Sequence, residues 1–198
     1  MLKNLLIIFF SLVISLTASI ENEFLTRVKQ KIEQIKPFSV KFKNQVVNNE
    51  SIELEESGEF FFKNSNELKW IYTEPDYKVW LIKNNRYKFY DKEDEQLTTG
   101  ILNDKDRLWI WQLINNDKFK KYLKINVRDK TIHIIKESEA INTKIFINNN
   151  YLPEKVVQKD QTGVDIIYIF YNYKNNTKFS KEDFELKIDD NTDIIELK

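Results

Sequence analysis

Apolar and polar residues alternate with a period of two along most of the chain, and this pattern constrains the fold more than any other feature. Phe38, Val40 and Phe42, for example, alternate with polar residues at 39, 41 and 43. Successive side chains of a β-strand point to opposite faces of a sheet, so the pattern predicts strands with one apolar and one polar face. In the first half of the chain further strand-like segments follow at 52–55, 59–63, 68–73, 78–83 and 86–91. The segment 78–83 carries apolar residues on both faces, so its inward face is left open.

The second half returns to strand-like sequence after an interruption. Its predicted strands lie at 122–128, 131–136, 143–148, 155–159 and 164–174, and the segment 184–197 closes the chain. In the first half, Asn84 and Asn85 separate two predicted strands. They suit a two-residue hairpin turn, because asparagine tolerates positive φ. The middle of the chain is therefore predicted to be an antiparallel meander.

Two segments have a helical pattern instead. Residues 20–36 carry Phe24, Val28, Ile32 and Ile35 at helical spacing with charged residues between them. We expect this helix to end at Pro37, because the residue before a proline avoids the α region. Residues 104–116 predict a second helix, capped by an aspartate at 104 or 106, with an apolar side formed by Leu108, Trp109, Trp111 and Leu113.

These elements predict an α+β fold that is mainly β. The order is a helix, a long antiparallel sheet, an aromatic helical insert and more sheet. Many consecutive strands with one face covered by helices favour an unclosed antiparallel β-barrel, or half-barrel. Because no internal repeat or low-complexity linker interrupts the chain, we expect one domain over residues 20–198.

Residues 1–19 have the layout of a secretory signal peptide. Lys3 is followed by an apolar run from Leu5 to Leu16 and then by small residues, with cleavage expected after Ala18 or Ser19. An uncleaved membrane anchor is the alternative, but the run is shorter than the roughly 20 residues that a bilayer span needs. We therefore expect the mature protein to be exported and soluble.

The chain has no cysteine. This excludes a disulfide framework, thiol chemistry, cysteine-ligated zinc and a lipid-bearing cysteine after the signal peptide. In an oxidising compartment the fold must therefore depend on core packing alone, which a chain of this length permits.

The charge balance argues against a nucleic-acid partner. Without residues 1–19 the chain has 30 basic and 31 acidic residues, whereas a phosphate backbone calls for a basic domain or face. Basic residues do alternate with aromatic ones in one stretch, as in single-strand binders; they are Lys69, Lys78, Lys83, Arg86 and Lys88. The near-zero net charge and the export signal argue more strongly against nucleic-acid binding than this pattern argues for it.

Residues for catalysis are few. His133 is the only histidine and lies in a predicted strand, without the partners that triads and metal sites need. We expect it to be structural. The acidic runs are Glu53, Glu55 and Glu56, and Asp91, Glu93, Asp94 and Glu95. Lysines are interspersed, so these runs are interpreted as solvated faces, with the paired carboxylates of a glycosidase as the alternative. We expect no enzyme, no metal and no cofactor.

An aromatic sheet face remains. Phe60, Phe62, Leu68, Trp70 and Tyr72 share one parity within their strands, and the insert with Trp109 and Trp111 has the composition to lie over them. One interpretation is an ordinary barrel core. The other is the wall of an apolar cavity, which half-barrels can enclose. Such a cavity suits an acyl chain, because transfer of hydrocarbon from water is worth about 0.8 kcal/mol per CH₂.

The order of residues in this region resembles that of the outer-membrane lipoprotein carrier family, of the LolA type. The likeness covers nearly all of the chain after residue 19 and is most specific between Phe38 and Gln96. It rests on the early strand 38–42, on Gly58 with the following EFFFK, and on Leu68-Lys69-Trp70, Glu74-Pro75 and Phe89-Tyr90-Asp91. At the end of the chain, Phe184-Glu185-Leu186 and Asp193-Ile194-Ile195 resemble the family's last strand and tail.

The resemblance implies a periplasmic chaperone with helices forming a lid over a hydrophobic cavity. Such a carrier takes lipoproteins from an inner-membrane ABC transporter, hands them to an outer-membrane receptor and hydrolyses nothing. We expect a monomer. The residues expected to line the acyl-binding cavity or its lid are Phe38, Val40, Phe42, Phe60, Phe62, Leu68, Trp70, Tyr72, Phe89, Leu108, Trp109 and Trp111.

One departure from the family concerns lid closure. The family commonly has Arg-Pro after the position of Lys63, and that arginine is implicated in holding the lid closed. Asn64-Ser65 stands here instead, and asparagine lacks the charged fork of donors that arginine has. Either closure through Asn64 is weaker, or Arg86 or Arg107 supplies the donors. We expect Asn64 and Arg107 to take part in lid closure.

Other roles on the same fold stay open. The receptor of this pathway shares the fold but is anchored through a lipidated cysteine, which this chain lacks. An envelope sensor or structural protein is the first alternative. A carbohydrate hydrolase that uses paired carboxylates is the second.

Overall fold

The computed structural model describes residues 2–64, 66–102, 122–136, 141–159 and 162–197; the side chains of residues 2–18 and 141 lie outside the description. The chain begins with one helix, α1 (Leu2–Ile35). The strands that follow are β1 (Phe38–Asn48), β2 (Ser51–Asn64), β3 (Glu67–Glu74), β4 (Lys78–Lys83), β5 (Arg86–Asp91), β6 (Gln96–Ile101), β7 (Leu123–Asn126), β8 (Thr131–Lys136), β9 (Ile141–Ile147), β10 (Pro153–Lys159), β11 (Asp165–Lys174) and β12 (Asp193–Glu196), with a short 3-10 helix η4 (Glu182–Phe184) before the last strand.

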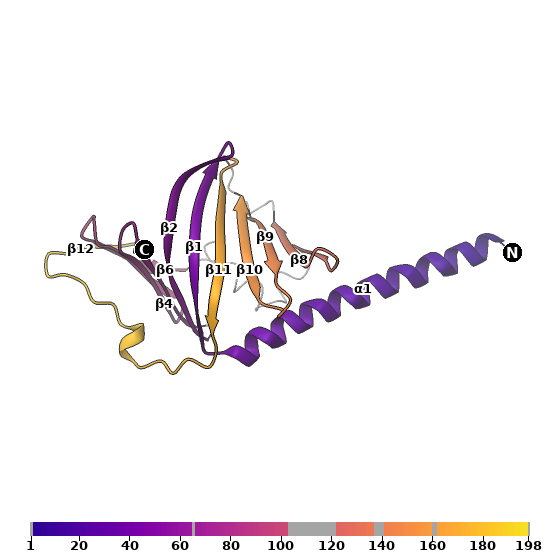
Figure 1. Cartoon of the computed structure of the whole chain (residues 1–198), viewed down its shortest axis with the longest axis horizontal. Helices are drawn as coiled ribbons and strands as arrows, with labels where there is room; N and C mark the ends of the chain where they lie inside the picture. The colour runs from indigo at the N-terminus through magenta and orange to yellow at the C-terminus, as the bar shows by residue number, and fades with distance from the viewer. Residues whose placement is uncertain (1, 65, 103–121, 137–140, 160–161, 198) are drawn as a thin grey trace.

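The twelve strands that the structure describes form one sheet, in the order β12-β6-β5-β4-β3-β2-β1-β11-β10-β9-β8-β7. Two antiparallel meanders, β1 to β6 and β7 to β11, meet where β1 pairs with β11. Within the described chain, β7 and β12 each have an outer edge without a partner strand, so the sheet curls but does not close (Figure 1). The predicted mainly-β, half-barrel architecture is confirmed.

The hairpin turn predicted between β4 and β5 is confirmed. Lys83 pairs with Arg86, and Asn84 and Asn85 both have positive φ, at 50° and 67°. This is the backbone of a two-residue hairpin that follows the right-handed twist of its strands.

The end of the chain differs from the prediction. Only Asp193–Glu196 is a strand in the segment predicted at 184–197, and it pairs with β6 in parallel. Phe184 lies in η4, and the backbone carbonyls of Asp183 and Glu185 accept hydrogen bonds from Lys69 Nζ, each at 3.0 Å. In a strand these carbonyls would accept hydrogen bonds from a neighbouring strand, but here they accept from Lys69. Because the side chain of Lys69 points to the outer face of the sheet, this stretch lies across that face.

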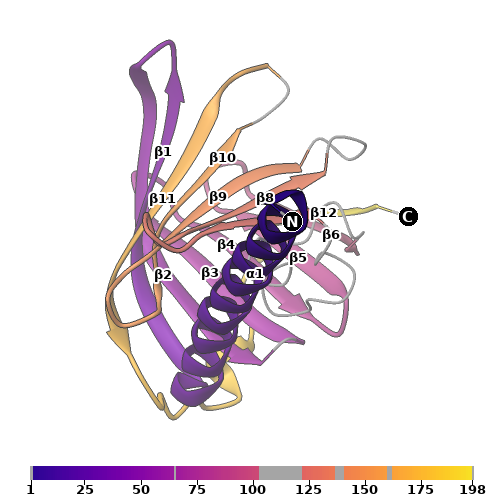
Figure 2. The ribbon, with the colours of Figure 1, turned by 90° about the vertical axis from the view of Figure 1, so that its right-hand side faces the viewer.

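Helix α1 covers the other face. It crosses the concave side of the sheet, and its N-terminal part projects away from the strands (Figures 1 and 2). The predicted helix 20–36 is confirmed, ends before Pro37 and continues without a break towards the N-terminus. Phe24, Val28, Ile32 and Ile35 are buried, as their spacing predicts. In the part of the chain that the structure describes, no helix is long and apolar enough to cross a membrane.

Candidate functional site

The inner face of the sheet, the face that α1 covers, carries a row of apolar and mostly aromatic side chains across five strands. Val40 on β1 pairs with Phe60 on β2, which pairs with Trp70 on β3. Trp70 then pairs with Trp80 on β4, and Trp80 with Phe89 on β5. Residues directly opposite each other in an antiparallel pair point to the same face. The row therefore forms one continuous apolar wall.

Trp70 lies at the centre of this wall. Its ring centroid is 4.6 Å from that of Phe60, 5.0 Å from Phe42 and 5.2 Å from Tyr168 on β11. These tilted and edge-on arrangements are the preferred geometries of aromatic pairs. The contact with Tyr168 joins the two meanders across β1, so the wall continues from one half of the sheet into the other.

The structure brings together most of the residues that the sequence nominated. Eight of them are buried in one core with α1: Phe38, Val40, Phe42, Phe60, Phe62, Leu68, Trp70 and Tyr72. Phe89 is half-buried, with its ring centroid 4.5 Å from that of Trp80. Arg107, Leu108, Trp109 and Trp111, together with the helix predicted at 104–116, lie outside the described residues.

Among the described residues, little space is left where α1 packs against Phe38 and Phe60 of the wall. A void of about 10 Å³ lies there, which is room for about one water molecule. Its lining comes from α1, β1, β2, the β9–β10 turn, β10 and β11, namely Ile32, Phe38, Val40, Phe60, Leu152, Pro153, Phe170 and Tyr173. At this place an acyl chain would therefore have to displace α1, because the void is too small to take it.

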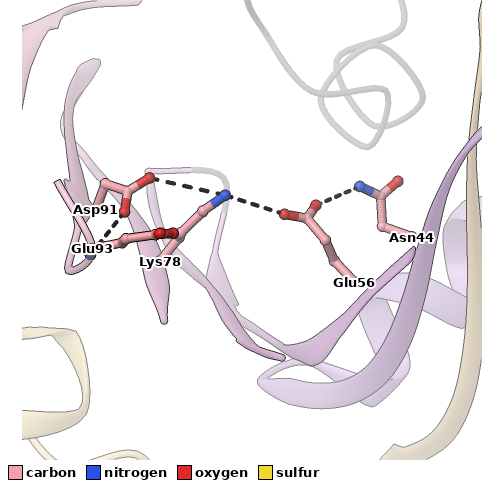
Figure 3. Close-up of polar contacts among 5 residues, drawn as sticks. All are labelled: Asn44, Glu56, Lys78, Asp91 and Glu93. Carbon is pink, nitrogen blue, oxygen red and sulfur yellow. Dashed lines mark hydrogen bonds and ion pairs between the residues drawn. The ribbon is translucent and has the colours of Figure 1, made fainter. Parts of the chain in front are cut away.

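A polar chain of side chains borders the wall at one end (Figure 3). Asn44 Nδ2 donates to Glu56 Oε2 at 2.9 Å. Lys78 Nζ lies 3.5 Å from Glu56 Oε1 and 3.9 Å from Asp91 Oδ2, so it bridges the two carboxylates. Asp91 Oδ1 also accepts from the backbone N–H of Glu93 at 3.1 Å. Glu56 is only 8% exposed, and a buried carboxylate needs such partners.

Two tyrosines next to this polar chain stay neutral over a wide pH range. Burial raises the pKa of Tyr72 well above its ordinary value of 10, and interactions with Tyr168 and Glu56 act in the same direction. Burial also raises the pKa of Tyr168; a hydrogen bond with Tyr72 partly opposes this rise, and the charge of Glu56 adds to it. The inner face therefore presents hydroxyl groups here without a phenolate charge.

Two buried polar atoms of the inner face have no hydrogen-bond partner among the described residues. They are Oδ1 of Asn44 and Nε1 of Trp70. A buried polar group left unpaired costs about 1–3 kcal/mol. Most such groups in folded proteins are paired, so an unpaired donor and an unpaired acceptor on one apolar wall need an explanation.

Sequence reasoning missed Asn44 and Glu56. The interpretation of the acidic run as a solvated face holds for Glu53 and Glu55, which are exposed, and is wrong for Glu56, which is buried. The signal was present in the alternation. Asn44 continues the inward parity of Phe42, and Glu56 shares the parity of Phe60.

The structure gives Asn64 a local role. It is exposed at the end of β2, where its Oδ1 accepts from the backbone N–H of Asn66 at 2.8 Å. Arg86 is exposed too, and its Nη2 lies 3.5 Å from Glu196 Oε1. The proposed role of Asn64 and Arg107 in lid closure stays a prediction.

The described part of the chain also includes other residues that were weighed for chemistry. His133 is half-buried on β8, with Nε2 2.7 Å from Asn142 Oδ1. Across the described ranges, no three His, Asp or Glu side chains are grouped to hold a metal ion. Lys69, one of the basic residues that suited single-strand binding, is buried under the C-terminal segment.

Comparison with known families gives a match over most of the chain. The model of the family described as "Outer membrane lipoprotein carrier protein LolA" matches residues 33–187. The chain is also similar to a protein of Campylobacter jejuni named "Outer-membrane lipoprotein carrier protein". The two are 27% identical over 158 residues, which cover 80% of this chain and 85% of that protein.

Solved structures share the fold at low sequence identity. A LolA superfamily protein from Nitrosomonas europaea aligns with a TM-score of 0.51 and 12% identity, over 84% of this chain and 97% of that one. An uncharacterized conserved protein from Thermus thermophilus aligns with a TM-score of 0.55 and 12% identity, over 89% and 98%. The Pseudomonas aeruginosa MucA/MucB complex aligns with a TM-score of 0.51 and 10% identity, over 83% of this chain and 60% of that one. At these identities the likeness establishes the architecture alone.

Proposed function

The chain belongs to the LolA family of outer membrane lipoprotein carrier proteins, and from this premise we propose that it is a periplasmic chaperone for lipoproteins. It binds the acyl chains of lipoproteins released from the inner membrane and transfers them to an acceptor in the outer membrane. The proposal assigns no catalytic step and no cofactor to the chain. The observation that supports it most directly is the continuous aromatic wall under α1, centred on Trp70.

The energetics of the wall suit a reversible carrier. Five apolar side chains of α1 are buried in the core, namely Phe24, Leu25, Val28, Ile32 and Ile35. Burial of such side chains is worth roughly 1.5–3 kcal/mol each, or about 8–15 kcal/mol together. Removing a 16-carbon acyl chain from water is worth about 12 kcal/mol on the same scale. An acyl chain that displaces this part of α1 therefore exchanges one apolar contact for a similar one, so that both uptake and release are accessible.

The remaining parts of the proposal come from membership of the family and from the sequence. They are export through cleavage of residues 1–19, a monomeric carrier, an inner-membrane ABC transporter as the donor and an outer-membrane receptor as the acceptor. Lid roles for Leu108, Trp109 and Trp111 also belong here.

Native mass spectrometry of the purified protein tests the proposal. We expect the protein to bind a triacylated lipoprotein with 1:1 stoichiometry and to release it to outer-membrane vesicles that contain the acceptor. Protein that never takes up a lipoprotein would refute the carrier function and favour a sensor or structural role. Uptake without release would favour a sensor.

A substitution in the wall sharpens the test. Trp70→Glu places a carboxylate in the centre of the apolar face and should abolish lipoprotein uptake, because a charge buried there has no partner. Tyr171→Glu is the matched control, since Tyr171 is an exposed aromatic residue of β11 that pairs with the outward-facing Lys41. Full uptake by the Trp70→Glu protein, with folding confirmed by circular dichroism, would place the acyl site elsewhere.

A further inference from the structure

We propose that Asn44 and Trp70 form a subsite for an acyl amide, the group that joins a fatty acyl chain to a peptide nitrogen. In this subsite the amide N–H of the ligand donates to Asn44 Oδ1, and the carbonyl oxygen of the ligand accepts from Trp70 Nε1. The inference rests on the proposed function, because the acyl chain itself needs the apolar wall. It goes further in assigning a preferred chemical group and an orientation to the ligand.

The orientation of Asn44 is set by its neighbours. Its Nδ2 donates to Glu56 Oε2 at 2.9 Å, and Glu56 is in turn held by Lys78. Glu56 is acceptor-only when ionised, so the amide of Asn44 must present its nitrogen to Glu56 and turn its oxygen away. Figure 3 shows this arrangement, with the oxygen of Asn44 on the side opposite Glu56. The polar chain therefore leaves one hydrogen-bond acceptor open.

Trp70 supplies the complementary donor. Its side chain is 2% exposed, and its Nε1 has no acceptor among the described residues. An indole nitrogen only donates, so the group that completes it must be an acceptor. Trp70 is otherwise surrounded by rings, which fix its orientation but accept no strong hydrogen bond.

The two open atoms belong to one part of the inner face. Tyr168 links them, since it is the register partner of Asn44 across β1 and β11 and its ring centroid is 5.2 Å from that of Trp70. Both residues are more than nine-tenths buried, Asn44 at 5% exposure and Trp70 at 2%. A site here therefore lies in the same apolar surroundings as the acyl chain and becomes accessible only when the cover of the wall is displaced.

The chemistry of the pair favours an amide over the other linkages of lipids. An amide carries one donor and one acceptor, which match the open acceptor and the open donor. An ester carries only acceptors and would leave Asn44 Oδ1 unpaired. A free carboxylate would bring a charge close to the carboxylate of Glu56, and like charges at such range repel. The raised pKa values of Tyr72 and Tyr168 fit this assignment, because they keep the neighbouring hydroxyls uncharged.

A matched pair of ligands tests the subsite. N-palmitoyl glycine methyl ester and O-palmitoyl glycolic acid methyl ester differ only in an N–H that replaces an oxygen. Each is titrated against the purified protein with a dansyl-labelled fatty acid bound, and displacement of the label gives its affinity. Hexadecane serves as the probe without a polar group. We expect the amide to bind about 2- to 12-fold more tightly than the ester, the range for one added hydrogen bond.

Variants separate the two contacts. Asn44→Leu should bring the amide-to-ester ratio to about one and leave the affinity for the ester unchanged. Trp70→Phe removes the N–H but keeps an aromatic ring, and should weaken both the amide and the ester relative to hexadecane. Tyr171→Phe, which alters an exposed aromatic residue on the outer face of β11 and outside the wall, is the control and should leave all three ratios as in the unaltered protein.

The outcomes distinguish failure of the amide subsite from failure of the proposed carrier function. Equal affinity of the unaltered protein for amide and ester overturns the subsite while acyl binding stands. A protein that binds neither the label nor any of the probes refutes the proposed function itself. The ratio measured on the unaltered protein needs no substitution, so the test holds even if Asn44→Leu fails to fold.

Discussion

Gly58 on β2 lies where the backbone of β3 and the ring of Phe42 approach most closely. A Cβ at this position would lie 1.8 Å from the backbone oxygen of Ile71 and 3.0 Å from Cζ of Phe42. The pairing of β2 with β3 also shifts register between Ser57 and Gly58. We predict that Gly58→Ala destabilises the protein by about 1–3 kcal/mol or more, because backbone atoms must move to make room.

Thermal denaturation checks this prediction, with Ser57→Ala as the neighbouring control. A Gly58→Ala protein that keeps the Tm of the unaltered protein would show that β3 has more freedom to move than its register indicates.

Glu67 provides a pH-dependent contribution to stability. Burial raises its pKa, but hydrogen bonds and charges from Lys63 and Lys83 outweigh burial and hold the pKa below 4.5. Glu67 lies 2.7 Å from Lys63 Nζ and 3.3 Å from Lys83 Nζ. Because the folded-state pKa is lowered, the stabilisation is present above the unfolded-state pKa and is lost as the pH falls through the folded-state pKa.

We predict that Glu67→Gln lowers the free energy of unfolding at pH 7 by about 1 kcal/mol or less, since both lysines are partly solvated. The difference from the unaltered protein should shrink towards zero as the pH falls below 4.5. Urea titrations at pH 7 and pH 3 measure it, with the exposed Glu154→Gln as control. A difference that stays constant between these pH values would exclude the proposed ion pairing as its cause.

At this scale the sequence predicts apolar positions well and polar ones poorly. Alternation alone identifies Phe42, Phe60 and Trp70 as residues of one face. It also assigns Asn44 and Glu56 to that face, but their chemistry argues for solvent. They are buried because each satisfies the other across β1 and β2, and such pairing is visible only once the register is known.

At the scale of elements, the segment after β11 forms a second apolar layer on the outer face of the sheet. Lys69 Nζ donates to the carbonyls of Asp183 and Glu185, and the ring of Phe184 is 5.2 Å from that of Phe179. Burial lowers the pKa of Lys69 and the charge of Asp183 opposes this. The ammonium group thus holds the segment in place through charge-assisted hydrogen bonds.

We predict that Lys69→Met costs about 1.5–3 kcal/mol of stability, the range for hydrogen bonds to a charged group. Hydrogen exchange should become faster at the amides around Phe184 and unchanged in β8 and β9. The exposed Lys41→Met is the control. Unchanged exchange around Phe184 would mean that its ring packing, and not Lys69, holds the segment.

This layer explains why β4 was ambiguous in sequence. Trp80 and Ile82 face inwards, whereas Val79 and Leu81 face outwards, and yet three of these four are fully buried. A strand that is covered on both faces carries apolar residues on both, so its sequence does not alternate between apolar and polar residues. The parallel pairing of β12 was equally invisible, because its register depends on backbone bonds such as Asp193 N–H to Glu95 O at 2.8 Å.

For the whole molecule, the arrangement that matters most is the position of β1 between β2 and β11. Alternation predicts most of the strands and the sides that they bury, although the segments predicted at 52–55 and 59–63 form the single strand β2 and β6 was not predicted. It does not say which strands are neighbours. The order of the predicted elements favoured a half-barrel and the resemblance to a family implied the same, and the pairing of Phe42 with Phe170 shows how its two halves are joined. This long-range pairing places Tyr168 next to Trp70 and so completes the wall.

If α1 and an acyl chain compete for the wall, weakening α1 should favour the acyl chain. Val28 lies on the side of α1 that faces the sheet and is completely buried. We predict that Val28→Ala lowers the free energy of unfolding by about 2 kcal/mol, from lost burial and the cavity left behind. At the same time it should raise the affinity for a dansyl-labelled fatty acid.

Chemical denaturation and fluorescence titration measure the two effects, with Thr26→Ala on the exposed side of α1 as control. Lower stability with unchanged or reduced affinity for the fatty acid would show that α1 is not the element that the ligand displaces.

Because α1 runs without a break through the predicted cleavage site, cleavage there would change the stability of the helix that covers the wall. A cut after Ala18 or Ser19 would turn the middle of one helix into a new helix start, only four or five residues before the buried Phe24. Its first turn loses the hydrogen bonds that the preceding turn supplied, and its α-ammonium group opposes the positive end of the helix dipole. Glu21 and Glu23 then lie where negative charge offsets that end. Maturation would thus loosen the start of the helix that a cargo must move aside, so that a precursor still in the membrane is the less receptive form.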